Sequence, residues 1–252
     1  YKVFDTVFGG FFSQDTTLDL AVDDYSNINL VKVLIERNID KFDIVAVATV
    51  DEAVDIRKLG YAREIFVLNQ PFETEIEKIV QYGITVGISS YAFAEQLGKI
   101  KSTVRVHVEI GTGMGRTGIH PYRVDQYIKS LPENIVVEGV YTHLSSADND
   151  DEFTRNQIKS FHAAVNTMQE MLGKLKYIHC SASNGIVNYP DAHFNLVRAG
   201  LIMYGYASAE VHSRSACGRY HRRRGRSYGY SRYKDARPCI ARCDSYRGIL
   251  VY

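Results

Sequence analysis

Apolar and polar residues in the middle of the chain follow two alternating periods. Short apolar runs, or runs apolar at every second position, predict β-strands, and apolar residues three or four positions apart predict helices. From residue 27 onward the two kinds of segment follow each other in strict order. The predicted strands cover 44–48, 65–68, 84–88, 104–110, 136–142, 177–181 and 194–199. The predicted helices cover 28–38, 50–59, 73–81, 91–97, 121–131 and 151–172, with a short helix after 181.

This order predicts an α/β fold with a parallel sheet. Strands that are apolar throughout, such as IVAVA at 44–48, are typical of burial on both faces. An open doubly wound sheet usually carries its phosphate loop after the first strand. Here the glycine-rich and polar strand ends come late and continue to the last strand, which favours a (β/α)8 TIM barrel. Only seven strands are apparent, so we expect the first barrel strand, ahead of the helix at 28–38, to be missing or replaced.

The two ends of the chain lack this pattern. Residues 1–27 are rich in Phe, Asp and Gly, and only 18–22 alternate in a way that could form a strand. Residues 208–252 contain too few aliphatic side chains to bury a core, which predicts a disordered basic tail. We therefore divide the chain into an atypical segment (1–27), a barrel (28–207) and a tail that forms no domain (208–252).

Charge is distributed unevenly along the chain. Residues 209–252 hold 11 Arg and Lys against 3 Asp and Glu, whereas the net charge of the whole chain is only +1. An arm in which Arg and Tyr alternate could bind nucleic acid. The alternative is non-native sequence, such as a shifted reading frame on both sides of an intact middle. We favour the second interpretation, because both ends lose the pattern abruptly while the middle keeps it.

Composition excludes several classes of protein. No apolar run approaches the roughly 18 residues of a membrane span, and the chain does not start like a signal peptide, so we expect a cytoplasmic protein without membrane contact. Four cysteines do not make a disulfide framework at this length. Cys239 and Cys243 lack the second pair that a zinc site of this kind needs.

Candidate chemistry lies where the predicted strands end. The run 104–118 is a strand followed by a loop of four glycines around Arg116, and later strand ends carry His143, Ser183, Arg198 and Gly200. Each alone has a structural explanation, such as a helix cap for the serine. In a barrel they converge on one mouth. Together they predict a pocket for a planar anionic ligand, with its phosphate at the serine hydroxyl and the N–H groups near Gly200.

Three motifs carry a family resemblance. GTGMGRTG, EGVYTHLSSAD, and IHCSASNGIVNYPD followed by NLVRAGLIMYG resemble, in order and spacing, the successive signatures of the alanine racemases. These are fold-type III enzymes that depend on pyridoxal 5'-phosphate (PLP). IVAVATVDEAVDIRKLGY and EIFVLNQ resemble the second and third barrel units of the family, so the resemblance covers roughly 28–207. NGIVNYP is similar to the branch that includes the serine/alanine racemases.

The resemblance implies a role for each residue at the mouth. Arg116 would hydrogen-bond the phenolic oxygen of PLP, and His143 would stack on the pyridine ring. Arg198 would face the pyridine nitrogen, and its charge would disfavour protonation there. Glu109 departs from the family, most of whose members have a carbamylated lysine at this position. A glutamate would supply the carboxylate directly and orient Arg116 by a charge-assisted bond. The phosphate would be held by Ser183 and the backbone at Gly200 and Leu201.

Two further departures concern catalysis. The first strand of the family ends in V-K-A-x-A-Y-G-H-G, whose lysine forms the Schiff base with PLP and acts as one of two bases. Here the sequence reads LDLAVDDYSN, and neither Lys2 nor Lys32 is suitably placed. In the family the opposing tyrosine base belongs to a β-rich C-terminal domain and acts across a homodimer interface. After Tyr206 this chain continues instead into the basic tail, in which Tyr228 and Tyr230 match no motif of the family.

The resemblance therefore implies a fragment of a PLP-dependent racemase. Its substrate would be alanine or serine, and its role would be the interconversion of L- and D-alanine for cell-wall synthesis. We expect the chain to be inactive, because both bases are absent. The alternatives are a barrel that binds PLP without catalysis and, less favoured, a nucleic-acid binder that acts through its tail.

Overall fold

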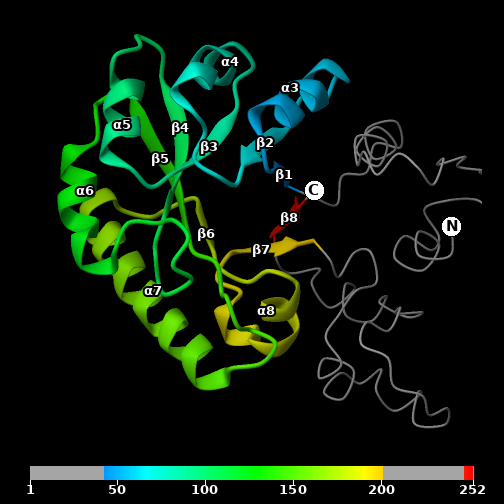
Figure 1. Cartoon of the computed structure of the whole chain (residues 1–252), viewed down its shortest axis with the longest axis vertical. Coiled ribbons are helices and arrows are strands. Elements are labelled where there is room, and N and C mark those ends of the chain that lie inside the picture. The colour runs from blue at the N-terminus through cyan, green and yellow to red at the C-terminus, as the bar shows by residue number, and fades with distance from the viewer. Residues whose placement is uncertain (1–42, 201–246, 252) are drawn as a thin grey trace, which may run out of the picture.

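A computed structural model describes residues 43–200 and 247–251 of the chain. In this part the predicted (β/α) barrel is confirmed, and seven of its strands lie where the hydrophobic pattern predicts them (Figure 1). The strands are β1 (Ile44–Val47), β2 (Glu64–Val67), β3 (Thr85–Ile88), β4 (Val104–Glu109), β5 (Ile135–Tyr141), β6 (Tyr177–His179), β7 (Leu196–Ala199) and β8 (Arg247–Val251).

One parallel sheet contains all eight described strands, in the order β6-β5-β4-β3-β2-β1-β8-β7. The two strands at the ends of this order, β6 and β7, are also joined. The Arg198 backbone N–H donates to the Ser181 carbonyl at 2.9 Å, and the Ile178 N–H donates to Asn195 Oδ1 at 2.7 Å. These bonds hold the two end strands of the curled sheet beside each other, as the shape of a barrel requires.

Helices follow the strands and lie on the outside of the barrel (Figure 1). Polar caps set where they begin. Thr49 and Glu52 form a capping box at α3, and Asp150 accepts a hydrogen bond from the Phe153 N–H at the start of α7. The predicted helix at 28–38 lies outside the described residues. Those described are α3 (Val50–Lys58), α4 (Ile76–Gln81), α5 (Tyr91–Gly98), α6 (Val124–Ser130), α7 (Asp151–Leu172), α8 (Ser183–Asn188) and the 3-10 turns Glu73–Glu75, Pro121–Arg123 and Pro190–Ala192.

β8 occupies the place of the strand that the sequence lacks. It lies between β7 and β1, with Ile249 in register with Ile44 on one side and Arg198 on the other. The prediction of a disordered tail is therefore wrong for Arg247–Val251. The physical reason is that two parallel strands with an open space between them leave backbone groups in need of partners. The rest of the tail, 208–246, and the segment 1–27 lie outside the described residues.

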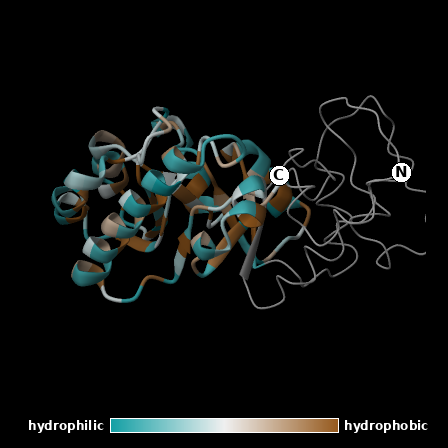
Figure 2. Cartoon of the chain, turned by 90° about the horizontal axis from the view of Figure 1, so that it is seen from below, coloured by the Kyte–Doolittle hydropathy of each residue, from teal (hydrophilic) through white to brown (hydrophobic). Residues whose placement is uncertain are grey.

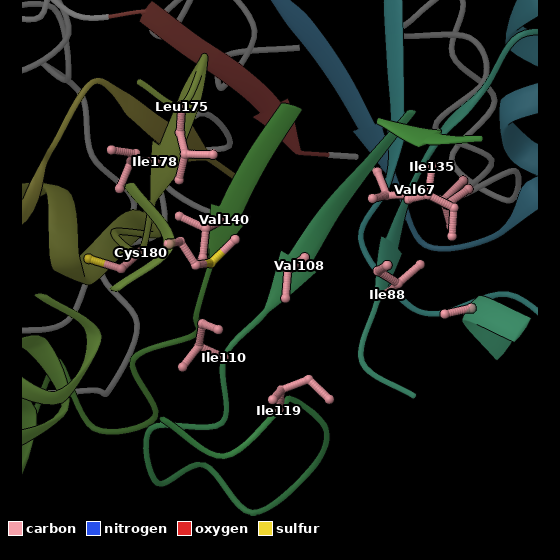
Figure 3. Packing of buried hydrophobic residues seen from close by; sticks show 14 of the residues in the cluster. Val67, Ile88, Val108, Ile110, Ile119, Ile135, Val140, Leu175, Ile178 and Cys180 are labelled. Atoms are coloured by element: carbon pink, nitrogen blue, oxygen red, sulfur yellow. The ribbon is translucent and has the colours of Figure 1, made fainter. Parts of the chain in front are cut away.

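Alternation along the strands divides the core into two layers. Side chains that point outward, such as Val108, Val140 and Ile178, form the larger apolar cluster with residues of the surrounding helices (Figure 3). Figure 2 shows hydrophobic colour on the strands and hydrophilic colour on outer parts of the helices. No helix in the described ranges has the length and apolar character needed to cross a membrane. A smaller cluster inside the barrel contains Ile44, Ala46, Phe66, Tyr141, Tyr177 and Leu196.

Polar and aromatic side chains lie inside the barrel beside the aliphatic ones. The rings of Tyr141 and His179 are stacked, with centroids 5.2 Å apart and planes 4° apart. Two glycines make room for these rings. A Cβ at Gly139 would lie 2.8 Å from the His107 ring, and one at Gly87 would collide with the Tyr141 hydroxyl. These rings therefore fill the inside of the barrel below the carboxyl ends of its strands.

Replacing Ile249 with proline tests whether β8 is part of the barrel. Ile249 lies in the middle of a strand with neighbours on both sides, and proline removes the N–H that the ladder uses. We expect Ile249→Pro to lower the free energy of unfolding by about 3 kcal/mol, measured by urea denaturation. Ile249→Val keeps the backbone N–H and is the control, so it should leave the ladder intact. Equal unfolding midpoints for the proline variant and the parent would show that β8 does not hold the barrel together.

Candidate functional site

A cavity of about 440 Å³ opens at the carboxyl ends of the strands. Arg116, His143, Ser183, Arg198 and Gly200 all line it, so the structure brings together five of the six residues proposed to bind the cofactor. The sixth, Leu201, lies outside the described residues. The remaining lining residues are Ala48, Leu68, Asn69, Tyr141, Leu144, Ser145, Ala147, Asp148, Ala182, Asn184 and Gly185.

Arg198 is a buried cation at the base of this cavity. Its side chain comes from β7 and is 2% exposed. One terminal nitrogen, Nη2, donates to the carbonyls of Thr142 at 2.8 Å and Cys180 at 3.0 Å. The other, Nη1, donates to the His179 carbonyl at 3.2 Å and to its ring Nδ1 at 2.8 Å. Backbone carbonyls and an imidazole therefore satisfy the two terminal amino groups of the guanidinium, which need partners because they are removed from water.

These contacts determine the protonation of two buried histidines. A guanidinium only donates, so His179 Nδ1 accepts and its proton is on Nε2. His179 Nε2 lies 3.0 Å from His107 Nδ1, which must accept in turn and leaves the His107 proton on Nε2. Burial and then the nearby cations Lys176 and Arg198 lower the pKa of His107 to about 3. Burial, Arg198 and His107 lower the pKa of His179 well below its ordinary value. Both rings are therefore neutral.

His143 lies at the edge of the cavity, directly after β5. Burial, followed by the positive charges of Arg198 and Arg116, lowers its pKa to about 4. Its ring Nδ1 lies 3.4 Å from Arg198 Nη2. A neutral imidazole held in this way presents a flat apolar face, which suits stacking on an aromatic ligand.

Arg116 lies on the loop after β4. Gly113, Gly115 and Gly118 have φ angles of 139°, 72° and 111°, which only glycine adopts without strain. Arg116 is exposed and, among the described residues, makes no hydrogen bond or ion pair. Its five donors are thus available to a ligand in the cavity.

Glu109 has a different partner from the one expected. Its carboxylate is 5% exposed and lies 3.3 Å from the Tyr141 hydroxyl, whose single proton is shared between Glu109 and the Leu68 carbonyl. Within the described residues it forms no ion pair with Arg116, so this arrangement does not include the predicted charge-assisted bond. The carboxylate instead lies below Tyr141, one of the cavity residues. Burial and then Glu109 raise the pKa of Tyr141, so the phenol remains protonated.

Sequence reasoning missed Gln157 and His107. Gln157 lies on the inner face of α7 and is 1% exposed, and His107 is fully buried in β4. A polar residue among the apolar positions of the helix at 151–172 was the available signal for Gln157. Its partners come from loops far away in the sequence, so the signal did not indicate what it binds.

A second polar cluster lies deeper in the barrel. His107 approaches Glu64 and Glu138, with one ligand atom of each residue within 4.8 Å of the others. Lys176 Nζ already bridges the two carboxylates at 3.4 and 3.3 Å. Because the hydrogen bond to His179 leaves a proton on His107 Nε2, this nitrogen is a donor without a lone pair for a metal. We interpret the cluster as a structural ion-pair network in which Glu64 and Glu138 offset the positive charge of Lys176.

The buried histidines predict how stability depends on pH. Folded His107 stays neutral down to about pH 3, whereas in the unfolded chain it gains a proton below an ordinary pKa of about 6.5. The unfolded state therefore binds more protons between these values, and the free energy of unfolding falls as the pH falls. We expect His107→Gln to remove about 1.4 kcal/mol per pH unit from this slope between about pH 4 and about pH 6. Urea unfolding at a series of pH values measures it, and identical slopes in both proteins would contradict a neutral His107.

Comparison with known proteins assigns the family. Residues 26–208 match the family described as alanine racemase, N-terminal domain. The chain is 34% identical over 197 residues to an alanine racemase of Methanococcus maripaludis, a match that covers 75% of this chain and 52% of that protein. An alanine racemase of Carboxydothermus hydrogenoformans is 32% identical over 191 residues, covering 73% of this chain and 51% of the relative.

A solved structure gives the same result. The alanine racemase of Clostridium difficile 630 is similar with a TM-score of 0.67 and 30% sequence identity, over 71% of this chain and 51% of that one. The chain thus spans about half the length of the relatives it matches. Because the family match extends over more than half of the sequence, we conclude that this chain belongs to the alanine racemase family and that its barrel is that family's N-terminal domain.

Proposed function

We propose that the cavity binds PLP and that the chain is the cofactor-binding barrel of an amino-acid racemase. The observation that carries the proposal is the convergence of Arg116, His143, Ser183, Arg198 and Gly200 on one cavity. The volume of about 440 Å³ is within the range of small-ligand pockets. Two guanidinium groups, a hydroxyl and a neutral imidazole suit a flat, phosphorylated, phenolic ligand. The donor set therefore fits the cofactor that the family implies.

PLP, when bound, withdraws electrons from the α-carbon of an amino acid and thereby acidifies its proton. The residues of this chain would orient the ring for that purpose. Arg116 would donate to the phenolic oxygen, and His143 would cover one face of the ring. Ser183 and the backbone at Gly200 and Leu201 would hold the phosphate at the edge of the cavity formed by α8 and the end of β7.

Arg198 would control the pyridine nitrogen. It is a permanent donor with no lone pair, so it cannot protonate this nitrogen by acting as an acid at neutral pH. Its Nη protons are engaged by Thr142, His179 and Cys180, and Nε–H is the donor without a partner among the described residues. A positive charge at this position keeps the nitrogen unprotonated and so limits the electron withdrawal of the ring.

The covalent step would need a lysine at the cavity. No lysine among the described residues lines the cavity, and LDLAVDDYSN, where the family has its lysine, lies outside them. We therefore propose that the chain holds PLP non-covalently and does not racemise alanine or serine on its own. Racemisation in the cytoplasm, D-alanine supply and a homodimeric assembly would be properties of the whole enzyme.

Absorption spectroscopy tests this proposal. We expect PLP titrated into the purified chain to bind, borohydride to fix none of it, and L-alanine to remain unracemised. Arg116→Ala and Ser183→Ala should each raise the dissociation constant about tenfold, since a hydrogen bond to a charged group contributes about 1.5 kcal/mol or more. Exposed Arg123→Ala lies outside the cavity and is the control. Covalent fixation with turnover would show that an unrecognised lysine acts here, and absence of binding would reject the cofactor.

Glu109→Gln tests the buried carboxylate. It removes a negative charge from beneath Tyr141 and the cavity floor while keeping the shape of the side chain. We expect weaker PLP binding or a shifted absorption maximum of the bound cofactor. Glu133→Gln makes the same chemical change at an exposed position and should alter neither. Unchanged affinity and absorption in Glu109→Gln would show that the carboxylate has no role at the site.

A further inference from the structure

Gln157 is a buried amide whose full hydrogen-bonding capacity is used. It projects from α7 and is 1% exposed. Its Oε1 accepts from the Ser145 backbone N–H at 3.1 Å and from the Ser145 hydroxyl at 3.3 Å. Its Nε2 donates to Thr112 Oγ1 and to the His143 carbonyl, both at 3.3 Å. An amide offers two lone pairs and two protons, and all four are engaged here.

These partners belong to two different loops of the cavity. Thr112 lies on the glycine loop 111–118, which carries Arg116, and His143 and Ser145 lie on the loop after β5. The Thr142 hydroxyl donates to the Ile110 carbonyl at 2.7 Å, so it must accept from Thr112, 2.8 Å away. Thr112 in turn accepts from Gln157. The bonds thus run in one direction, from the helix through Thr112 on the glycine loop and Thr142 after β5 to the Ile110 carbonyl directly after β4.

Packing supports the same connection. A Cβ added at Gly113 would lie 2.9 Å from Phe153 Cζ and 3.6 Å from Gln157 Cγ. The backbone of the glycine loop therefore rests directly on the inner face of α7. Arg116, three residues further on, makes no hydrogen bond or ion pair within the described part of the chain. Its place over the cavity depends on how its loop is held.

We propose that Gln157 is a positioning residue that couples the glycine loop to the His143 loop, so that Arg116 and His143 take their places at the cavity as one unit. The inference rests on the proposed function for its meaning, because those two residues would bind the phenolic oxygen and the ring face of PLP. The coupling itself belongs to the unliganded protein and can be tested there.

Hydrogen–deuterium exchange of the whole chain tests the coupling without ligand. Gln157→Met keeps the length and removes all four bonds, so amides in both loops should exchange about fivefold to tenfold faster. Gln157→Glu can still accept from Ser145 but cannot donate when ionised. The Ser145 amide should then stay protected while the glycine loop exchanges faster. Asn156→Asp makes the matched amide-to-carboxylate change at the exposed neighbouring position and should alter neither loop. Faster exchange in only one loop of Gln157→Met, or in neither, would overturn the proposal.

A double-mutant cycle connects the coupling to PLP. If Gln157 acts through Arg116, Gln157→Met should raise the dissociation constant of PLP about fivefold in the parent, but by a smaller factor in Arg116→Ala. Additive effects would overturn a positioning role. Unfolding midpoints of each variant separate this from loss of fold. Absence of PLP binding in the parent would reject the proposed function, and the exchange experiment would still decide whether Gln157 couples the loops.

Discussion

The Arg198 guanidinium is a positive charge enclosed within the barrel, and much of the structure is arranged to satisfy it. Burial of an unsatisfied cation costs several kcal/mol, and within the described residues no carboxylate forms an ion pair with it. Its donors reach the carbonyls of Thr142, His179 and Cys180 instead. These carbonyls lie at the ends of β5 and β6, while Arg198 itself comes from β7. The cation therefore joins β7 to the ends of β5 and β6. Burial, followed by the charge of Arg198, keeps His179 neutral, and burial, Lys176 and Arg198 keep His107 neutral.

A single property of the strands, the alternation of side chains, produces both the scaffold and the site. One set of residues packs outward against the helices and supplies the apolar core. The other set faces inward and places His107, Tyr141, His179 and Arg198 in contact beneath the cavity. Exchanging the two sets by a shift of one residue would place charges in the apolar layer, so packing and chemistry enforce the same register.

β8 fills a position in the sheet of the barrel without supplying a lysine. β8 lies between β7 and β1 and pairs with both through its backbone. Its sequence, RGILV, contains no lysine. Within the described residues, the residues that line the cavity come from the other strands and from the loops and the helix that follow them.

Local pattern in the sequence determined the seven strands, their helices, the barrel class and the convergence of Arg116, His143, Ser183, Arg198 and Gly200. Periodicity and loop glycines are properties of neighbouring residues, and parallel strands necessarily bring their carboxyl ends together. Only the tertiary structure decided the place of β8, the partner of Glu109, and the roles of His107 and Gln157. Each of these depends on contacts between segments far apart in the chain, such as Thr112 with Gln157, which the pairing of β4 with β5 and the packing of α7 bring within hydrogen-bonding distance.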